Sequence, residues 1–245
     1  MTLPDQSRIS ENASIQAISQ KHGYIDRCMA HSIEYSKKLV LPYLRNSSSV
    51  LEIGPAEGFL SEFLFDNTSH YEIVEPSKLF AKDLKNRFPQ SIVNCCMIED
   101  FNTRKKYDFI LLSHVLEHVI DPVSVLRRCQ NFMKENSILF CIVPNSHSIH
   151  RQAAVRMGLL EKEDQLNESD ILHGHKRVYD ISLLNNHFLN ADFNIISSGG
   201  YWLKPLSNSQ IEKSWSDDML SAFMALGESY PDISAEIYIA SCLNY

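Results

Sequence analysis

The chain has 245 residues, of which 44% are hydrophobic and 22% are charged, and its formal net charge at pH 7 is −7. This composition is typical of a globular protein and excludes the collagen-like, coiled-coil and disordered classes. The negative net charge argues against a protein that binds nucleic acid or a membrane surface non-specifically. No apolar run approaches the roughly 20 residues that cross a bilayer. The N-terminus lacks the apolar core of a signal peptide, so we expect a cytoplasmic protein.

The six cysteines agree with a reducing compartment. They form no C-x-x-C pair, and most lie in apolar runs, such as Cys141 in ILFCIV and Cys242 in IYIASC. We therefore expect reduced and mostly buried thiols that behave as small hydrophobic side chains.

The order of apolar segments along the chain predicts the fold class. Residues 1–47 are polar with weak helical periodicity, which predicts one or two helices that cover the rest of the protein. After them, short apolar runs alternate with amphipathic segments. The expected strands are residues 50–53, 71–74, 92–97, 109–112, 137–143, 193–197 and 236–242. The expected helices are residues 57–65, 77–88, 122–133 and 181–191. Such alternation indicates βαβ units, so the fold class is α/β with a parallel sheet.

A long polar stretch interrupts this alternation at residues 145–179. It is too long for a plain loop, and we interpret it as a helical insertion on the substrate side. The sequence has no internal repeat. We therefore expect a single domain over residues 1–245, with a cap formed by residues 1–47 and 145–179.

The turn after the first expected strand, within V-L-E-I-G-P-A-E-G, carries the clearest functional signal. Gly54 permits a sharp turn, Ala56 is small, and Gly58 lets the following helix approach closely. Such a turn directs backbone N–H groups and a helix N-terminus toward a ligand. Glu52 lies on the strand itself, where a carboxylate needs a partner such as a ligand ammonium. Glu75 ends the second strand, where a carboxylate can accept both hydroxyl hydrogens of a ribose.

A nicotinamide dinucleotide site is the alternative for this turn. Its fingerprint is G-x-G-x-x-G. Here Ala56 replaces the middle glycine, and the acidic Glu57 lies inside the turn. A carboxylate at that place would repel a pyrophosphate, which makes dinucleotide binding the weaker interpretation.

Together with later segments, the turn resembles class I S-adenosylmethionine-dependent methyltransferases. The segments are E-I-G-P-A-E-G, Glu75-Pro76, M-I-E-D-F at 97–101, Y-D-F-I-L-L-S-H-V-L-E-H-V at 107–119 and V-P-N at 143–145. The chain departs from the family at Ala56, where a glycine is common. The resemblance implies S-adenosylmethionine as cofactor. It also implies a Rossmann-like, seven-stranded, mostly parallel sheet with helices on both faces and an antiparallel last strand.

The same resemblance implies the cofactor-binding residues. Glu52 and the turn hold the methionine part, Glu75 takes the ribose hydroxyls, and Met97 and Ile98 flank the adenine. Ser113 and its neighbour His114 lie beside the sulfonium. The full expected set is Glu52, Gly54, Pro55, Ala56, Gly58, Glu75, Pro76, Met97, Ile98, Glu99, Ser113 and His114. Each has a structural alternative: Glu52 could bridge to an arginine, Glu75 could be a solvated loop residue, and Met97 and Ile98 could be core.

Two histidines are candidates for catalysis. If the acceptor is a hydroxyl, a base must take its proton, and an imidazole titrates near neutrality. His118 is the first candidate and His175 the second, with packing or helix capping as the alternative. His114 and His118 lie four residues apart in H-V-L-E-H, which is not the H-E-x-x-H zinc motif. Because no third ligand is clearly placed, we expect no metal.

The two ends of the insertion, S-H-S-I-H-R and H-G-H-K-R, are basic, whereas its acidic residues lie in the middle. If both ends return to the strand tips, they form a positive rim that could hold an acceptor carboxylate or phosphate. The expected acceptor-binding residues are His150, Arg151, Lys176, Arg177 and Tyr179. The alternative is that these residues pair with the acidic residues at 161–170.

The sequence as a whole predicts transfer of a methyl group from S-adenosylmethionine to a small molecule. The expected acceptor is a hydroxyl, carboxylate or amine of a sugar, a polysaccharide precursor or a natural product, and we expect this molecule to be anionic. We expect no nucleic-acid or membrane partner, and the sequence leaves a homodimer open. The alternatives are a catalytically silent, methyltransferase-like binding protein and a nicotinamide-dependent oxidoreductase. The presence of Glu52, Gly54, Gly58 and Glu75 argues against the silent protein.

Overall fold

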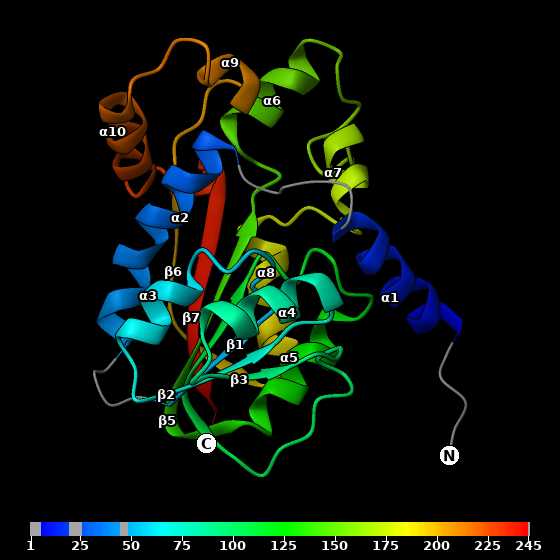
Figure 1. The fold of residues 1–245 in the computed structure, drawn as a ribbon. Coiled ribbons are helices and arrows are strands. Elements are labelled where there is room, and N and C mark those ends of the chain that lie inside the picture. Colours follow the sequence, from blue (N-terminus) through cyan, green and yellow to red (C-terminus); the bar gives the residue numbers. More distant parts are fainter. Residues whose placement is uncertain (1–5, 20–25, 45–48, 245) are drawn as a thin grey trace.

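The computed structural model describes residues 6–19, 26–44 and 49–244. They build a seven-stranded sheet with the order β3-β2-β1-β4-β5-β7-β6 (Figure 1). β1 pairs in parallel with β2 and β4, and β7 is antiparallel to both of its neighbours. The strands are β1 (Ser49–Ile53), β2 (His70–Val74), β3 (Ile92–Asn94), β4 (Tyr107–Ser113), β5 (Met133–Pro144), β6 (Phe193–Tyr201) and β7 (Glu236–Leu243). The predicted mostly parallel sheet with an antiparallel last strand is confirmed.

Helices cover both faces of the sheet, because the central strands bury side chains on both sides. In β1, Val50 belongs to one hydrophobic cluster, whereas Leu51 and Ile53 belong to the other. The cluster that contains Val50 includes residues of α2, α3, α4 and α10. The cluster that contains Leu51 and Ile53 includes residues of α5 and α8. The helices are α1 (Gln6–Ser19), α2 (Arg27–Val40), α3 (Ser61–Asp66), α4 (Lys78–Arg87), α5 (Pro122–Gln130), α6 (Ile149–Arg156), α7 (Glu168–His173), α8 (Ile181–Asn190), α9 (Asn208–Ile211) and α10 (Asp217–Gly227).

Some predicted boundaries were wrong for identifiable reasons. α3 begins at Ser61 rather than at residue 57, because Ala56 and Gly58 adopt φ angles of 50° and 69°, outside the right-handed helical region. β3 ends at Asn94 rather than at residue 97, because the chain turns there and the N–H of Cys96 bonds back to the carbonyl of Asn94. β5 begins at Met133 rather than at residue 137, because Met133 pairs with Tyr107 of β4, and β6 extends to Tyr201 because it pairs along β7.

The insertion and the N-terminal segment lie near the carboxyl ends of the parallel strands. Residues 145–179 contain α6 and α7, and Figure 1 shows α6 beside α9 at one end of the molecule. Gln16 of α1 donates a hydrogen bond to the carbonyl of Pro76 at 2.7 Å, which ties α1 to the segment after β2. Among the helices of the described residues, none has the length and apolar character that a membrane crossing requires.

Candidate active site

A cavity of about 740 Å³ opens at the carboxyl ends of the parallel strands. Its wall includes the turn after β1, the ends of β2 and β4, the segment after β3 and residues from both ends of the insertion. Open α/β sheets bind ligands at such a place, where the strand order reverses, here between β1 and β4. The volume suits a small-molecule site.

The turn after β1 has the backbone geometry that its sequence predicts. Gly54 has a φ of 65°, and its N–H donates to the carbonyl of Val74 at 2.8 Å. A Cβ atom added to Gly58 would lie 2.4 Å from a methyl group of Leu84, so only glycine lets α4 pack this closely. Ala56 also has a positive φ, which explains why glycine is common at this position in the family that the sequence resembles.

The carboxylate of Glu75 points toward this turn. One oxygen accepts the N–H of Ala56 at 3.0 Å, and the other accepts the N–H of Ser77 at 2.7 Å. Burial raises the pKa of Glu75 to about 7, although both N–H groups act in the opposite direction. Each oxygen can accept a further hydrogen bond. The solvated-loop alternative is therefore wrong, because Glu75 is a buried acceptor at the edge of the cavity.

Glu52 is buried beside the turn and is held by hydroxyl groups. One of its oxygens accepts hydrogen bonds from Ser61, at 2.6 Å, and from Tyr71. These partners take the place of the arginine considered from the sequence. Burial raises the pKa of Glu52 to about 7, and the two hydroxyls partly counteract this effect.

Most of the residues expected to bind the cofactor meet at the cavity. Gly58 is the exception, since its position serves the packing of α4. Those that line the wall are Glu52, Gly54, Pro55, Ala56, Glu75, Pro76, Met97, Ile98, Glu99, Ser113 and His114. Met97 and Ile98 are largely buried, so they form an apolar wall and are also part of the core.

His114 follows β4 directly, on the floor of the cavity, with a φ of 55°. Its Nδ1 atom lies 3.2 Å from a carboxylate oxygen of Glu117, and its Nε2 atom lies 3.8 Å from one of Glu236. Burial lowers the pKa of His114, but the two carboxylates more than offset this and raise it to about 9. His114 is therefore an imidazolium. Glu236 was missed from the sequence, although a charged residue at the start of an apolar strand was a usable signal.

The two candidate catalytic histidines lie together. The rings of His118 and His175 are 4.7 Å apart in an edge-to-face arrangement, and both residues line the cavity. Burial lowers the pKa of His118 to about 4, despite the opposing carboxylate of Glu117. His118 is therefore neutral at physiological pH and can accept a hydrogen bond.

Only some of the residues expected to bind the acceptor line the cavity. His150, Arg151 and Lys176 line the cavity. The guanidinium of Arg151 is nevertheless occupied within the insertion, since it lies 3.1 Å from the carboxylate of Asp170 and donates to the carbonyl of Glu163 at 2.7 Å. For Arg151, the alternative of pairing within the insertion is therefore the correct one.

Arg177 and Tyr179 lie behind the cavity wall, so placing them on a positive rim was wrong. The guanidinium of Arg177 donates to the carbonyls of Leu116, Val119 and Ile120 at 2.6–3.0 Å. These carbonyls belong to the loop after β4, which needs donors because it forms no helix. Tyr179 is fully buried, and its hydroxyl lies 3.4 Å from the same Leu116 carbonyl.

A half-buried lysine takes a place on the cavity wall instead. Lys204 follows β6, and its ammonium donates to Asn208 at 2.9 Å and lies over the ring of Trp202. Burial lowers the pKa of Lys204, while the carboxylate of Glu236 raises it. The wall therefore combines acidic and basic groups and is not a uniformly positive rim.

A Rossmann-like sheet with this cavity defines a nucleotide-binding α/β enzyme, and comparison with known proteins identifies the family. The family model described as a methyltransferase domain matches residues 25–198. The chain belongs to this family and is a class I S-adenosylmethionine-dependent methyltransferase. Among curated proteins, it is 30% identical over 94 residues to the ubiquinone biosynthesis O-methyltransferase of Bradyrhizobium diazoefficiens. That match covers 37% of the chain and 37% of the relative, so it spans little more than a third of the relative's length.

Solved methyltransferase structures share the fold at low sequence identity. One is a 1,6-didemethyltoxoflavin-N1-methyltransferase from Burkholderia thailandensis, with a TM-score of 0.65 and 12% identity, covering 100% of this chain and 93% of that one. Another is the N-methyltransferase NodS from Bradyrhizobium japonicum in complex with S-adenosyl-L-homocysteine. It has a TM-score of 0.58 and 11% identity, covering 97% of this chain and 98% of that one.

S-adenosylmethionine is the cofactor of this enzyme, and the residues present fit it. Glu75 offers a buried carboxylate with free acceptor capacity beside a turn whose backbone can approach a ligand closely. Met97 and Ile98 provide an apolar wall for a flat ring. When bound, the cofactor supplies a methyl group on a positively charged sulfur.

Proposed function

We propose that the enzyme transfers the methyl group to a hydroxyl of a small molecule, which binds in the part of the cavity lined by the insertion. The observation that carries this proposal is the continuity of the cavity. The same space extends from the turn at Gly54 to the histidines His118, His150 and His175. A donor held at the turn and an acceptor held by the insertion would therefore meet at the end of β4.

The chain's own residues would perform three tasks in this reaction. Glu75 and the turn hold the donor, and the insertion together with Ile15 and Ile18 of α1 keeps water away from the reacting atoms. The acceptor oxygen must approach the methyl carbon in line, at about 3 Å. His175 or His118 accepts the proton that the hydroxyl loses, and the oxygen forms the new bond to the methyl carbon as the carbon–sulfur bond breaks and a neutral thioether leaves.

The placement of the basic residues favours a hydroxyl over an anionic acceptor. Arg177 is bound to backbone carbonyls and Arg151 to Asp170, so neither guanidinium is available for a carboxylate or phosphate. Lys176 and Lys204 remain on the wall and can orient a polar group. The partial similarity to an O-methyltransferase supports the same choice. We keep the cytoplasmic location as a prediction and leave a homodimer open.

The proposal is tested by identifying the methylated product. The purified protein is incubated with a methyl-labelled donor and a metabolite extract, and the products are analysed by mass spectrometry. We expect a small molecule that gains one methyl ether, and no such product with the Glu75→Ala variant, which loses its hold on the donor. Label that appears only in protein, in nucleic acid or on nitrogen would refute the hydroxyl acceptor.

A further inference from the structure

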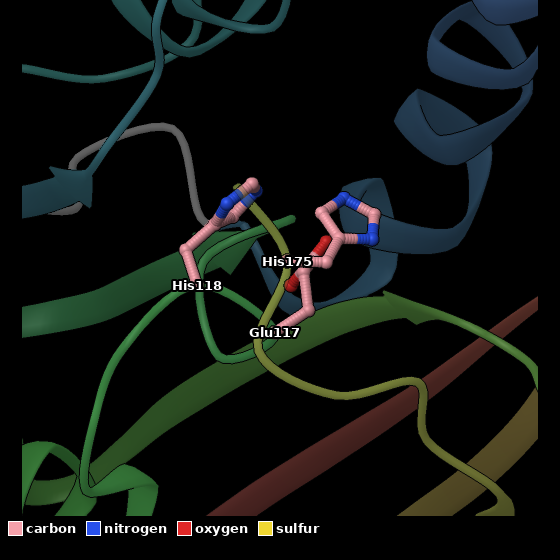
Figure 2. Close-up of side chains that lie close together, drawn as sticks. All are labelled: Glu117, His118 and His175. Atoms are coloured by element: carbon pink, nitrogen blue, oxygen red, sulfur yellow. The ribbon is translucent and has the colours of Figure 1, made fainter. Parts of the chain in front are cut away.

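Three side chains with metal-ligating atoms converge on one wall of the cavity. Glu117 and His118 lie in the loop after β4, and His175 follows α7. One ligand atom from each of them lies within 4.8 Å of the other two. Figure 2 shows the carboxylate of Glu117 beside the ring of His175, with the ring of His118 on the same side. The sequence did not place a third ligand clearly, and in the structure His175, from the far end of the insertion, is the candidate for it.

The carboxylate of Glu117 is the strongest indication of a ligand-binding site. Glu117 is completely buried, and neither of its oxygens has a partner in hydrogen-bond geometry among the described residues. Its close charge partner is His114, 3.2 Å from one oxygen. Buried carboxylates are normally paired, hydrogen-bonded or bound to a metal, because an unsatisfied buried charge costs several kcal/mol.

A carboxylate lies beside His175, as is common for metal ligands. The Nδ1 atom of His175 lies 3.3 Å from an oxygen of Asp170, an ion-pair distance without hydrogen-bond geometry, and Asp170 is itself held by Arg151 at 3.1 Å. Histidines that bind metals usually direct one ring nitrogen to a carboxylate, which fixes the ring and leaves the other nitrogen for the metal. The Arg151–Asp170 pair thus gains a role as support for His175.

We propose that Glu117, His118 and His175 bind a divalent transition-metal ion, with Zn²⁺ as the representative probe. Two imidazoles and one carboxylate form a donor set that suits such ions. Ligand atoms around Zn²⁺ are separated by roughly 3.3 Å, so binding must draw the two loops closer together. The remaining coordination positions would face the cavity, because all three residues line it.

With the ion bound, its ligands His118 and His175 would not accept the proton of the acceptor. The ion would instead promote ionisation of an acceptor hydroxyl next to it, since a bound cation lowers the pKa of a hydroxyl or water, and the proton would leave to solvent. This catalytic use rests on the proposed function, whereas binding of the ion does not. The two are therefore separated by measuring metal binding and cofactor binding independently.

The test is calorimetric titration of the chelator-treated full chain with Zn²⁺, with metal content and melting temperature measured in parallel. We expect one equivalent to bind and to raise the melting temperature. Glu117→Gln and His175→Ala should abolish this binding, and Asp170→Asn should weaken it by about 10- to 100-fold. His147→Ala, which removes a half-exposed histidine outside the cavity, is the matched control and should bind Zn²⁺ normally.

Two results would overturn the metal site. One is the absence of stoichiometric binding by the unmodified chain, and the other is unchanged binding in both Glu117→Gln and His175→Ala. S-adenosylhomocysteine binding, measured on the same samples, shows that each variant is folded, and His118→Asn replaces any variant that is not. Loss of Zn²⁺ binding with retained cofactor binding separates this site from the methyltransferase function itself.

Discussion

The carboxylate of Glu75 should make cofactor affinity depend on pH. Burial raises its pKa to about 7 in the free protein, so it is partly protonated at neutral pH. The two hydroxyls of a ribose donate to the ionised carboxylate, and the cofactor therefore favours that form. Binding must release a proton below pH 7, so affinity increases as the pH rises through this value and decreases as it falls.

The size of this change in affinity follows from the difference in the pKa of Glu75 between the free and the bound protein. If the bound cofactor returns the pKa of Glu75 to its ordinary value of 4.5, the bound carboxylate stays ionised from about pH 6 upward. In the free protein at about pH 6, only about a tenth of the molecules carry the ionised form. The dissociation constant should therefore fall about tenfold between about pH 6 and pH 8, which corresponds to about 1.4 kcal/mol.

The assay is calorimetric titration with S-adenosylhomocysteine at several pH values. Glu75→Gln should weaken binding and remove the pH dependence, because an amide neither titrates in this range nor offers two acceptor oxygens. Glu52→Gln is the matched control, since the pKa of Glu52 is also raised to about 7 but its carboxylate is held by Ser61 and Tyr71. The reasoning would be refuted if the affinity stayed constant or decreased as the pH rises. It would also be refuted if the pH dependence of the affinity disappeared only in Glu52→Gln.

Two further predictions concern stability and are checked by chemical denaturation. Arg177→Ala should lower the free energy of unfolding by about 2–4 kcal/mol, because the loop carbonyls at 116–120 lose a charged donor. Arg177→Lys should recover only part of this free energy, since an ammonium lacks the planar fork of a guanidinium. An unchanged free energy of unfolding in Arg177→Ala would show that water replaces the guanidinium. Gly58→Ala should lower the free energy of unfolding by about 2–3 kcal/mol, because Gly58 has a positive φ and an added Cβ would meet Leu84. A smaller decrease would mean that α4 can shift.

The cofactor side of the site was predictable because its residues follow directly from local patterns. Gly54 and Glu75 each come immediately after a strand that the apolar runs indicate, and parallel strands bring their carboxyl ends to one edge. The errors there were also local. Ala56 and Gly58 delay the start of α3, because positive φ angles are incompatible with the helix that their neighbours favour.

The acceptor side was less predictable because it depends on contacts between distant segments. In the sequence, Arg177 belongs to a basic cluster. In the structure, its guanidinium points toward carbonyls of the loop after β4, because these carbonyls have no donor from the sheet or from a helix. Glu236 reaches the cavity only because β7 inserts beside β5. The sequence marks Glu236 as an unusual charge at the start of an apolar strand, but the groups that it meets are set by the sheet order.

The charges on the cavity floor connect the metal site with the type of acceptor. The imidazolium of His114 and the ammonium of Lys204 balance the carboxylates of Glu117 and Glu236, so the floor is close to neutral before any ligand enters. Methyl transfer to an ionised oxygen consumes one negative charge and the positive charge of the sulfonium. A neutral floor does not stabilise the ionised oxygen, and a divalent cation at Glu117 would do so. An amine acceptor reacts as a neutral nucleophile and gains nothing from the cation, so Zn²⁺ binding at this site would itself favour a hydroxyl acceptor.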